Sequence, residues 1–250
     1  EVASFYVHRP EYPQRIFEQL VELSPHRHGL LDLGCGTGKI ARALAGSFAS
    51  VTAVDASKEM LRVAATLQRE ETRNIRWIHG LAEAADLEGA PFDLVVAAAS
   101  IHWMDHPVLF PRLASVVHAE HVFAVVDGDG AFEPPWQSEW DEFLQRWIYA
   151  LTGESYEPAR TDGPFMIRMT QYKDWIHVAG ETDVMSEPIV QIVDDFVACQ
   201  HSRDTFAPSK LGALRGQFDV ELASLLAPYA TDGSIRYRVR TRLTWGSIKA

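Results

Sequence analysis

Three glycines spaced two residues apart mark a segment that can bind a ligand. The sequence from Leu30 to Lys39 reads LLDLGCGTGK and places Gly34, Gly36 and Gly38 directly after an apolar run. Glycine adopts backbone angles closed to other residues and lets a ligand approach the main chain closely. One glycine is enough for a tight turn, so three at this spacing favour a binding loop over a plain turn.

An acidic residue stands where a ribose would be bound. Asp55 follows residues 51–54, VTAV, which indicate a second strand. A carboxylate at the end of the second strand of a nucleotide-binding sheet can accept hydrogen bonds from both ribose hydroxyls. Asp55 can also serve as a helix N-terminal acid, but Ser57 is already placed to cap the next helix. We therefore favour the ribose interpretation.

Two common phosphate-binding patterns do not fit this loop. The dinucleotide pattern G-x-G-x-x-G needs a third glycine where Lys39 stands. The P-loop pattern needs serine or threonine after the lysine, and Ile40 follows it. The loop therefore departs from both the dinucleotide pattern and the P-loop pattern.

The elements around these residues alternate between strand and helix. We expect strands at residues 30–33, 51–54, 75–78, 92–98 and 121–126, and helices at residues 39–45, after Ser57, and at 108–117. This alternation implies βαβ crossovers and a parallel sheet. Such sheets bind ligands at the carboxyl ends of their strands, where the glycine loop lies.

The alternation ends after Asp127. We expect no strands from there to about Ser209, a helix capped by Ser138, and another helix near residues 189–199. A further helix is expected at residues 218–227. The tail IRYRVRTRLTWGSI alternates apolar and basic residues, which predicts a strand with one exposed face.

Composition narrows the class of protein. The chain has 250 residues and a net charge of −11, which argues against duplex nucleic acid as a partner, although residues 236–242 could form a local basic patch. Two cysteines, Cys35 and Cys199, are too few for a disulfide framework and favour the cytoplasm. The longest apolar run, residues 94–99, is too short to span a membrane, and no signal peptide is visible. Histidine and cysteine spacing predicts no metal site.

Four motifs together resemble the class I S-adenosylmethionine-dependent methyltransferases. LDLGCGTG is similar to their first motif, VDASKEML to their second, and GLAEAADL with PFDLVVAAASIHWMD to their adenine loop and fourth strand. The resemblance covers residues 28–127. More narrowly, YVHRPEYP and ASIHW resemble the subgroup of trans-aconitate methyltransferase-like (methyltransferase type 11) small-molecule enzymes, whose trans-aconitate members carry an amide where His102 stands.

The resemblance implies an α/β fold. We expect a Rossmann-like, doubly wound, seven-stranded and mostly parallel sheet, with its last strand antiparallel, helices on both faces and a helical cap. Residues 1–250 would form a single methyltransferase domain. Within it we expect an N-terminal lid or helix at 1–25, a cofactor-binding half at 26–130, a helical cap at 131–209, and a C-terminal helix and strands at 210–250.

The resemblance also implies S-adenosyl-L-methionine as cofactor and S-adenosyl-L-homocysteine as product. Asp32 would hold the amino group of the methionine moiety through water or the loop. Gly34, Cys35 and Gly36 would let the backbone pass close to that moiety. Asp55 would bind the ribose.

The adenine would lie between two further segments. Ala56 and Met60 would pack on its face, although Met60 also fits plain helix packing. The Ala82 N–H and the Glu83 carboxylate would read its edge. Alternatively, Glu83 is an ordinary solvated acid.

The reacting methyl group would lie beyond the fourth strand. Ala97 and Ala98 would line the sulfonium end, with His102 and Trp103 following. An imidazole can remove a proton from an O–H or N–H acceptor, but His102 can equally be a hydrogen-bonded residue that only shapes the site. Trp103 would place an aromatic ring beside the sulfonium, and the face of such a ring attracts a cation.

Acceptor binding would involve the N-terminal segment and the cap. Tyr6 and Tyr12 would face the substrate from a lid, or belong to a surface-packing arm, and Trp136 would contribute from the cap. The cap's aromatic residues mostly fit a second hydrophobic core. Five basic residues there can hold an acceptor carboxylate or be solvated: Arg146, Arg160, Arg168, His201 and Arg203.

We therefore predict a cytoplasmic transferase, monomeric or homodimeric, that methylates a small-molecule carboxylate, hydroxyl or amine by in-line displacement. Such a reaction mainly needs alignment and exclusion of water. A dinucleotide-dependent oxidoreductase, an RNA or protein methyltransferase, and a catalytically silent cofactor-binding protein remain alternatives.

Overall fold

The chain forms two compact units. The computed structural model describes residues 2–68, 72–87, 91–156 and 169–249. The helical unit comprises Glu1–Glu11, Asp129–Thr161 and Met185–Arg240, and the sheet unit comprises Tyr12–Gly128, Asp162–Val184 and Thr241–Ala250. Each unit has a hydrophobic core of its own and is described by itself.

The sheet unit is built on seven strands in the order β3-β2-β1-β4-β5-β9-β6. Their bounds are β1 Gly29–Leu33, β2 Ser50–Asp55, β3 Ile75–His79, β4 Phe92–Ala98, β5 Val117–Asp127, β6 Ile176–Met185 and β9 Arg240–Ile248. The pairs among β1 to β5 are parallel, whereas β9 is antiparallel to β5. This confirms the expected Rossmann-like, mostly parallel sheet with an antiparallel last strand.

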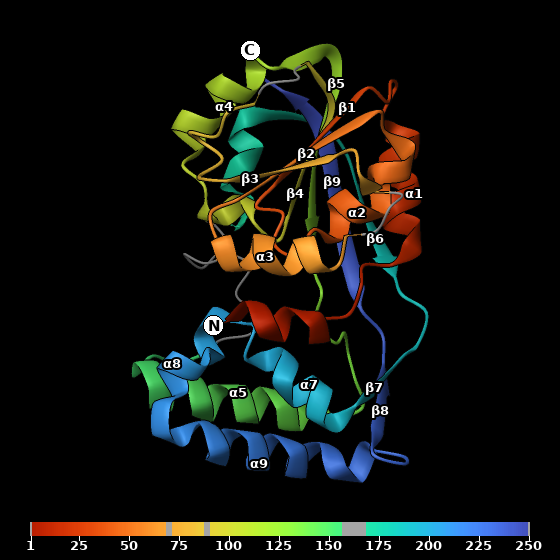
Figure 1. The fold of residues 1–250 in the computed structure, drawn as a ribbon. Helices are drawn as coiled ribbons and strands as arrows, with labels where there is room; N and C mark the ends of the chain where they lie inside the picture. Colours follow the sequence, from red (N-terminus) through yellow and green to blue (C-terminus); the bar gives the residue numbers. More distant parts are fainter. Residues whose placement is uncertain (1, 69–71, 88–90, 157–168, 250) are drawn as a thin grey trace. The chain divides into compact units, whose positions relative to one another are not determined.

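Helices cover both faces of this sheet (Figure 1). One core contains residues of α1 (Gln14–Leu23) and α2 (Lys39–Leu44), with Leu61 of α3 (Lys58–Thr66) packed against it. The other core contains residues of α4 (His106–Ala114) and Tyr172. Because both faces are covered, the central strands β1 and β4 are buried almost throughout, as their continuous apolar sequences predict.

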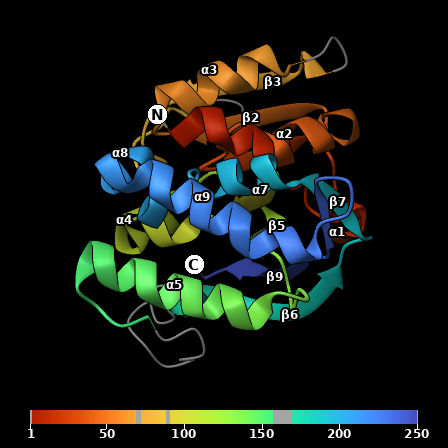
Figure 2. The ribbon, with the colours of Figure 1, turned by 90° about the horizontal axis from the view of Figure 1, so that it is seen from below.

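The helical unit packs helices around a small two-stranded sheet. Its α-helices are α5 (Gln137–Thr152), α7 (Val193–Gln200), α8 (Pro208–Leu211) and α9 (Arg215–Leu226), and its strands are the antiparallel pair β7 (Ile189–Ile192) and β8 (Ser234–Tyr237). In Figures 1 and 2, α9 runs beside α5 and α7. Aromatic rings dominate this core: Phe218 packs edge-on against both Phe143 and Trp147.

Two predictions about strands are wrong. The segment after Asp127 contains β6 and β7, and β6 joins the main sheet. Its sequence IHVAGETDVM is largely polar because β6 lies at the sheet edge, so its alternation is too weak to read as a strand. The tail forms two strands instead of one, since β8 pairs with β7 while β9 pairs with β5.

The helical predictions also need correction. The α5 helix begins one residue before Ser138, with Trp136 at the cap position, so Ser138 does not cap it. The expected helix at 189–199 is strand β7 followed by α7. The helical unit also differs from the expected cap of residues 131–209, because it includes the first eleven residues, β8 and α9.

Trp136 lies in the core of the helical unit. Its side chain is only 1% exposed and contacts the rings of Phe196, Tyr229 and Tyr237. This burial leaves no surface for a substrate, so Trp136 is not part of the acceptor site proposed below. Within the described part of the chain, no helix is long and apolar enough to cross a membrane.

We expect Trp136→Ala to lower the free energy of unfolding by about 3–5 kcal/mol, because it opens a cavity in a packed aromatic core. Trp103→Ala is the matched control, since Trp103 is 65% exposed and should change stability by no more than about 0.5 kcal/mol. Denaturant titration of both variants measures the difference. Equal stability of the two would contradict the core position of Trp136.

Candidate functional site

The glycine loop and Asp55 meet at one edge of the sheet. Strands β1 and β2 are parallel, with Leu33 paired to Val54, so both end at the same edge. The strand order reverses next to β1, whose neighbours are β2 and β4. In open α/β sheets this reversal opens a crevice at the carboxyl ends, where ligands bind.

The three loop glycines are required for different reasons. All have positive φ: +62° at Gly34, +56° at Gly36 and +79° at Gly38. A Cβ on Gly34 would lie 2.5 Å from the Ser100 Cβ, and one on Gly38 would lie 2.4 Å from the Trp77 ring. A Cβ on Gly36 would meet nothing within 4 Å. Protein packing thus explains the outer two glycines, and the open side of Gly36 fits a ligand.

Asp55 connects the loop to the next helix. Its Oδ2 accepts a hydrogen bond from the Gly36 N–H at 2.7 Å, and its Oδ1 accepts one from the Ser57 N–H at 2.7 Å. Ser57 in turn caps α3, with its Oγ accepting from the Met60 N–H. A carboxylate has about four acceptor positions, so these two bonds leave capacity for ribose hydroxyls. Asp55 therefore fits both interpretations of the sequence: it can bind a ribose, and it accepts a hydrogen bond at the N-terminus of α3.

Asp32 is buried and contacts α2, the helix that follows the loop. Its side chain is 1% exposed, and its Oδ2 accepts a hydrogen bond from the Ala41 N–H of α2 at 3.0 Å. The pKa of Asp32 is raised to about 7, mainly by burial; the Ala41 hydrogen bond opposes this shift, and the nearby charge of Asp55 adds to it. Among the described residues, the Asp32 Oδ1 has no hydrogen-bond partner. This position agrees with a role exerted through the loop.

The segment after β3 is fixed by other parts of the same edge. The Gly80 N–H donates to the Asp55 backbone oxygen at 3.0 Å. The Glu83 Oε1 accepts from the Asp105 N–H at 2.6 Å, just before α4, and Arg112 donates to the Glu83 backbone oxygen. Ala82 is buried. Glu83 is therefore not a free surface acid, because its carboxylate also holds the start of α4.

The end of β4 lies beside the end of β1, where the glycine loop begins. Ala97 is fully buried, Ala98 is half-buried, and Ala99 has a φ of +50°. The Ser100 Oγ donates to the Leu33 backbone oxygen at 2.6 Å, which joins the ends of β4 and β1. The chain turns sharply here and leads directly to His102.

His102 and Trp103 lie on a short helical turn, Ile101–Trp103, that follows this bend. Their ring centroids are 5.0 Å apart. His102 is half-buried, while Trp103 is largely exposed. An exposed indole next to a half-buried imidazole is an arrangement that can receive an acceptor molecule.

Other predicted residues have different positions. Cys35 is buried, and burial raises the pKa of its thiol well above the ordinary value, so it remains a neutral packing group. Met60 is buried, whereas Ala56 is exposed. Tyr12 lies in the sheet-unit core against Phe17.

The N-terminal and cap residues belong largely to the helical unit. Tyr6 is part of that unit. The guanidinium carbon of Arg9 lies over its ring, 4.2 Å from the ring centroid of Tyr6. Most of the basic residues considered for the acceptor already have partners: Arg146 pairs with Glu221, His201 with Asp219, and Arg203 with Asp129. Arg160 and Arg168 lie outside the described residues.

Two residues that position the loop could not be identified from the sequence. Trp77 of β3 packs against Gly38, and Ser100 packs against Gly34. Both contacts join segments far apart in the chain, and although Ser100 lies in the ASIHW motif, nothing in the sequence indicates its contact with Gly34. Within the described ranges, no group of histidine, cysteine or acidic residues has the geometry of a metal site.

Comparison with protein families identifies the segment that carries this site. Residues 30–120 match a family model described as a methyltransferase domain. These residues contain the glycine loop, Asp55 and the end of β4. The match agrees with the resemblance to class I S-adenosylmethionine-dependent methyltransferases that the motifs indicated.

Curated relatives match over the same region. A probable S-adenosylmethionine-dependent methyltransferase CRG1 of Saccharomyces cerevisiae is 31% identical over 120 residues, covering 46% of this chain and 41% of that protein. A trans-aconitate 2-methyltransferase of Deinococcus radiodurans is 34% identical over 116 residues, covering 45% and 42%. The chain thus spans less than half the length of these relatives.

A solved structure is similar over nearly the whole chain. A protein of Anaeromyxobacter dehalogenans, described as a candidate type II methyltransferase, superimposes with a TM-score of 0.72, covering 96% of this chain and 97% of that one, at 22% identity. At this identity the likeness extends the shared fold beyond residues 30–120.

The glycine loop gives a testable contrast. Gly36→Ala should reduce binding of S-adenosylhomocysteine at least about tenfold, because a methyl group enters the side expected to face the ligand, while positive φ costs about 1–2 kcal/mol of stability. Gly34→Ala and Gly38→Ala should each lower stability more, since both also create contacts below 3 Å. Calorimetry and thermal unfolding separate the two effects. Greater loss of stability in Gly36→Ala than in Gly38→Ala would contradict this division.

Asp32 should leave a pH signature. Its folded-state pKa of about 7 exceeds the ordinary value of 3.8, so the folded chain retains a proton that the unfolded chain has released between these values. This contribution to stability is complete below about pH 4 and is lost as pH rises through 7. The stability of Asp32→Asn relative to the unmodified chain should therefore increase over this window, by up to a few kcal/mol. A pH-independent difference in denaturant titrations would exclude the raised pKa.

Proposed function

We propose that this chain transfers a methyl group from S-adenosylmethionine to a small-molecule acceptor. The observation that carries the proposal is the open side of Gly36, which lies next to the Asp55 carboxylate at the edge where the strand order reverses. When bound, S-adenosylmethionine supplies an electrophilic methyl group on a sulfonium centre. The chain's own residues bind the donor and orient the acceptor.

The donor would be held by residues from four strand ends. Gly34, Cys35 and Gly36 present the backbone to the methionine moiety, and Asp32 fixes that loop from behind through α2. Asp55 accepts from the ribose while it retains the Gly36 N–H.

The adenine and the sulfonium would occupy the remaining strand ends. Ala56 and Met60 border the adenine on the β2 side, and Ala82 and Glu83 border it on the β3 side. Glu83 acts mainly as a positioning residue in this proposal, because its Oε1 holds the Asp105 N–H. Ala97 and Ala98 would line the sulfonium end.

His102 and Trp103 would form the acceptor side. The exposed Trp103 ring can cover an acceptor and exclude water from the reacting atoms. A carboxylate acceptor needs no base, whereas a hydroxyl or amine must lose a proton. We propose that His102 shapes this pocket in every case and accepts a proton only from a hydroxyl or amine acceptor.

A small molecule is favoured over RNA or protein. The chain carries a net charge of −11, which disfavours a polyanionic substrate. One relative of the matched region is named for methylating trans-aconitate, a small acid. We further propose that the protein acts in the cytoplasm.

Methyl turnover tests this proposal. The full chain, labelled methyl donor and a panel of small carboxylates, phenols and amines should yield labelled product and S-adenosylhomocysteine, while bulk RNA should not become labelled. If RNA alone became labelled, the substrate would be RNA and the small-molecule proposal would be wrong. Binding of NADH without any binding of S-adenosylhomocysteine would favour the oxidoreductase instead.

His102→Gln tests the proton-transfer role. With a carboxylate acceptor, kcat should change by less than about tenfold, because no proton is removed. With a hydroxyl or amine acceptor, kcat should fall by about 10²–10⁴ and lose its dependence on a group that titrates near neutral pH. Equal losses for both acceptor types would assign His102 a purely structural role.

A further inference from the structure

Two cations of the helical unit have no use in the site described above. Arg236 and Arg238 occupy alternate positions along β8 and its continuation, and both side chains are exposed, whereas Tyr237 between them is buried. Among the described residues, neither guanidinium has an ion pair or a hydrogen bond. In a chain with a net charge of −11, two such arginines on one strand face are unexpected.

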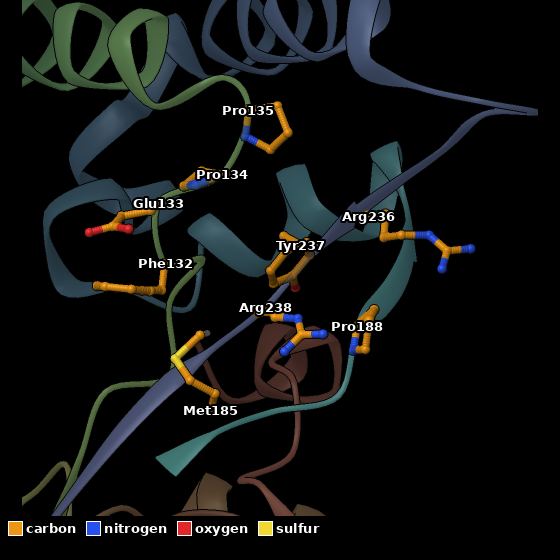
Figure 3. A pocket seen from close by; sticks show the side chains of 9 residues that line it. All are labelled: Phe132, Glu133, Pro134, Pro135, Met185, Pro188, Arg236, Tyr237 and Arg238. Atoms are coloured by element: carbon orange, nitrogen blue, oxygen red, sulfur yellow. The ribbon is translucent and has the colours of Figure 1, made fainter. Parts of the chain in front are cut away.

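Both arginines line a cavity of about 380 Å³ within the helical unit (Figure 3). Its other walls are mainly apolar and include Phe132, Pro134, Met185 and Pro188. We call this cavity the arginine groove. Its volume lies in the range typical of small-molecule sites, and its lining combines apolar surface with a few charged groups.

Both walls of the arginine groove are attached to the strand that carries the arginines. The Phe132 N–H donates to the Arg238 backbone oxygen at 2.8 Å, which fixes one wall. On the other wall, the Ser186 N–H donates to the Val239 backbone oxygen at 2.9 Å, and the Val239 N–H donates to the Ser186 Oγ at 2.9 Å. The groove is therefore pre-formed and does not depend on a ligand for its shape.

Two further residues make the arginine groove rigid. Glu133 has a φ of +43°, a strained conformation for a residue with a side chain, and Pro134 follows it directly. Such strain is often retained where a loop must hold a functional shape. The Tyr237 hydroxyl donates to the Gln191 Oε1 at 2.5 Å, and burial raises the pKa of Tyr237 well above its ordinary value. Tyr237 is thus a neutral part of the lining.

The charges of the arginine groove select an anion. A guanidinium binds a carboxylate or phosphate through two parallel hydrogen bonds. The acidic residue of the lining, Glu133, is exposed, and in Figure 3 its carboxylate points to the side opposite the Arg236 guanidinium. The apolar walls can cover a flat hydrocarbon body.

We propose that the arginine groove binds a small organic anion, with a carboxylate or phosphate held by Arg236 and Arg238 and an apolar body between Phe132 and the prolines. A nucleic acid fits less well, because proteins bind single strands along extended basic grooves in which aromatic side chains stack on successive bases. This site shares no residue with the proposed methyl-transfer site and does not depend on that function.

Calorimetry with phenyl phosphate and benzoate tests this site in the full chain. We expect saturable binding of at least one probe, with Arg236→Gln and Arg238→Gln each weakening it about tenfold through loss of a charge-assisted hydrogen bond. Arg27→Gln is the matched control, since it removes the same charge from an exposed position of the sheet unit and should leave affinity unchanged. Unchanged thermal unfolding shows that the groove variants remain folded.

Several outcomes would overturn this assignment. Failure of both probes to saturate below about 10 mM would exclude a specific anion site. Equal weakening of probe binding by Arg27→Gln would show that the loss of affinity comes from the change in net charge and not from a specific site. Tighter binding of a single-stranded oligonucleotide, lost in the same two groove variants, would make the ligand a polyanion.

Discussion

The candidate site depends on one carboxylate that holds two backbone N–H groups of different segments. Asp55 accepts from Gly36 in the loop after β1 and from Ser57 at the start of α3. The Cys35 N–H also donates to the Val54 backbone oxygen at 2.9 Å, which joins the loop to β2. Hydrogen bonds to a charged acceptor are about twice as strong as neutral ones, so the Asp55 contact can fix a loop that contains almost no side chains.

This arrangement explains why a glycine-rich loop can be well defined. Gly34 and Gly38 are held by Ser100 and Trp77, whose side chains occupy the space that a Cβ would need. Gly36 is different, because the space beside it is open. The loop is therefore held by side-chain packing at Gly34 and Gly38. At Gly36 its backbone has open space on the side where we propose that the donor binds. Rigid placement of the donor is what an in-line displacement requires.

Much of the sheet unit could be predicted from the sequence, since its central strands β1 and β4 are mainly apolar and its motifs are local. Asp55, the glycines and the Ser57 cap all lie within a few residues of a recognisable strand end. The rest depends on contacts between distant segments. Nothing in the sequence near Glu83 indicates its bond to Asp105, and the polar strand β6 becomes a strand only because an edge position tolerates such residues. Trp136 was expected in a pocket because aromatic residues suit both pockets and cores.

The most direct measurement is a calorimetric titration of S-adenosylhomocysteine into the unmodified chain and into Asp55→Asn. The amide keeps the size of the side chain but places an N–H₂ group against the Gly36 or Ser57 N–H. We expect the unmodified chain to bind and the variant to bind about ten- to a hundredfold more weakly, while it remains folded in thermal unfolding. Equal affinities in the two proteins, or no binding to the unmodified chain, would contradict the central role of Asp55.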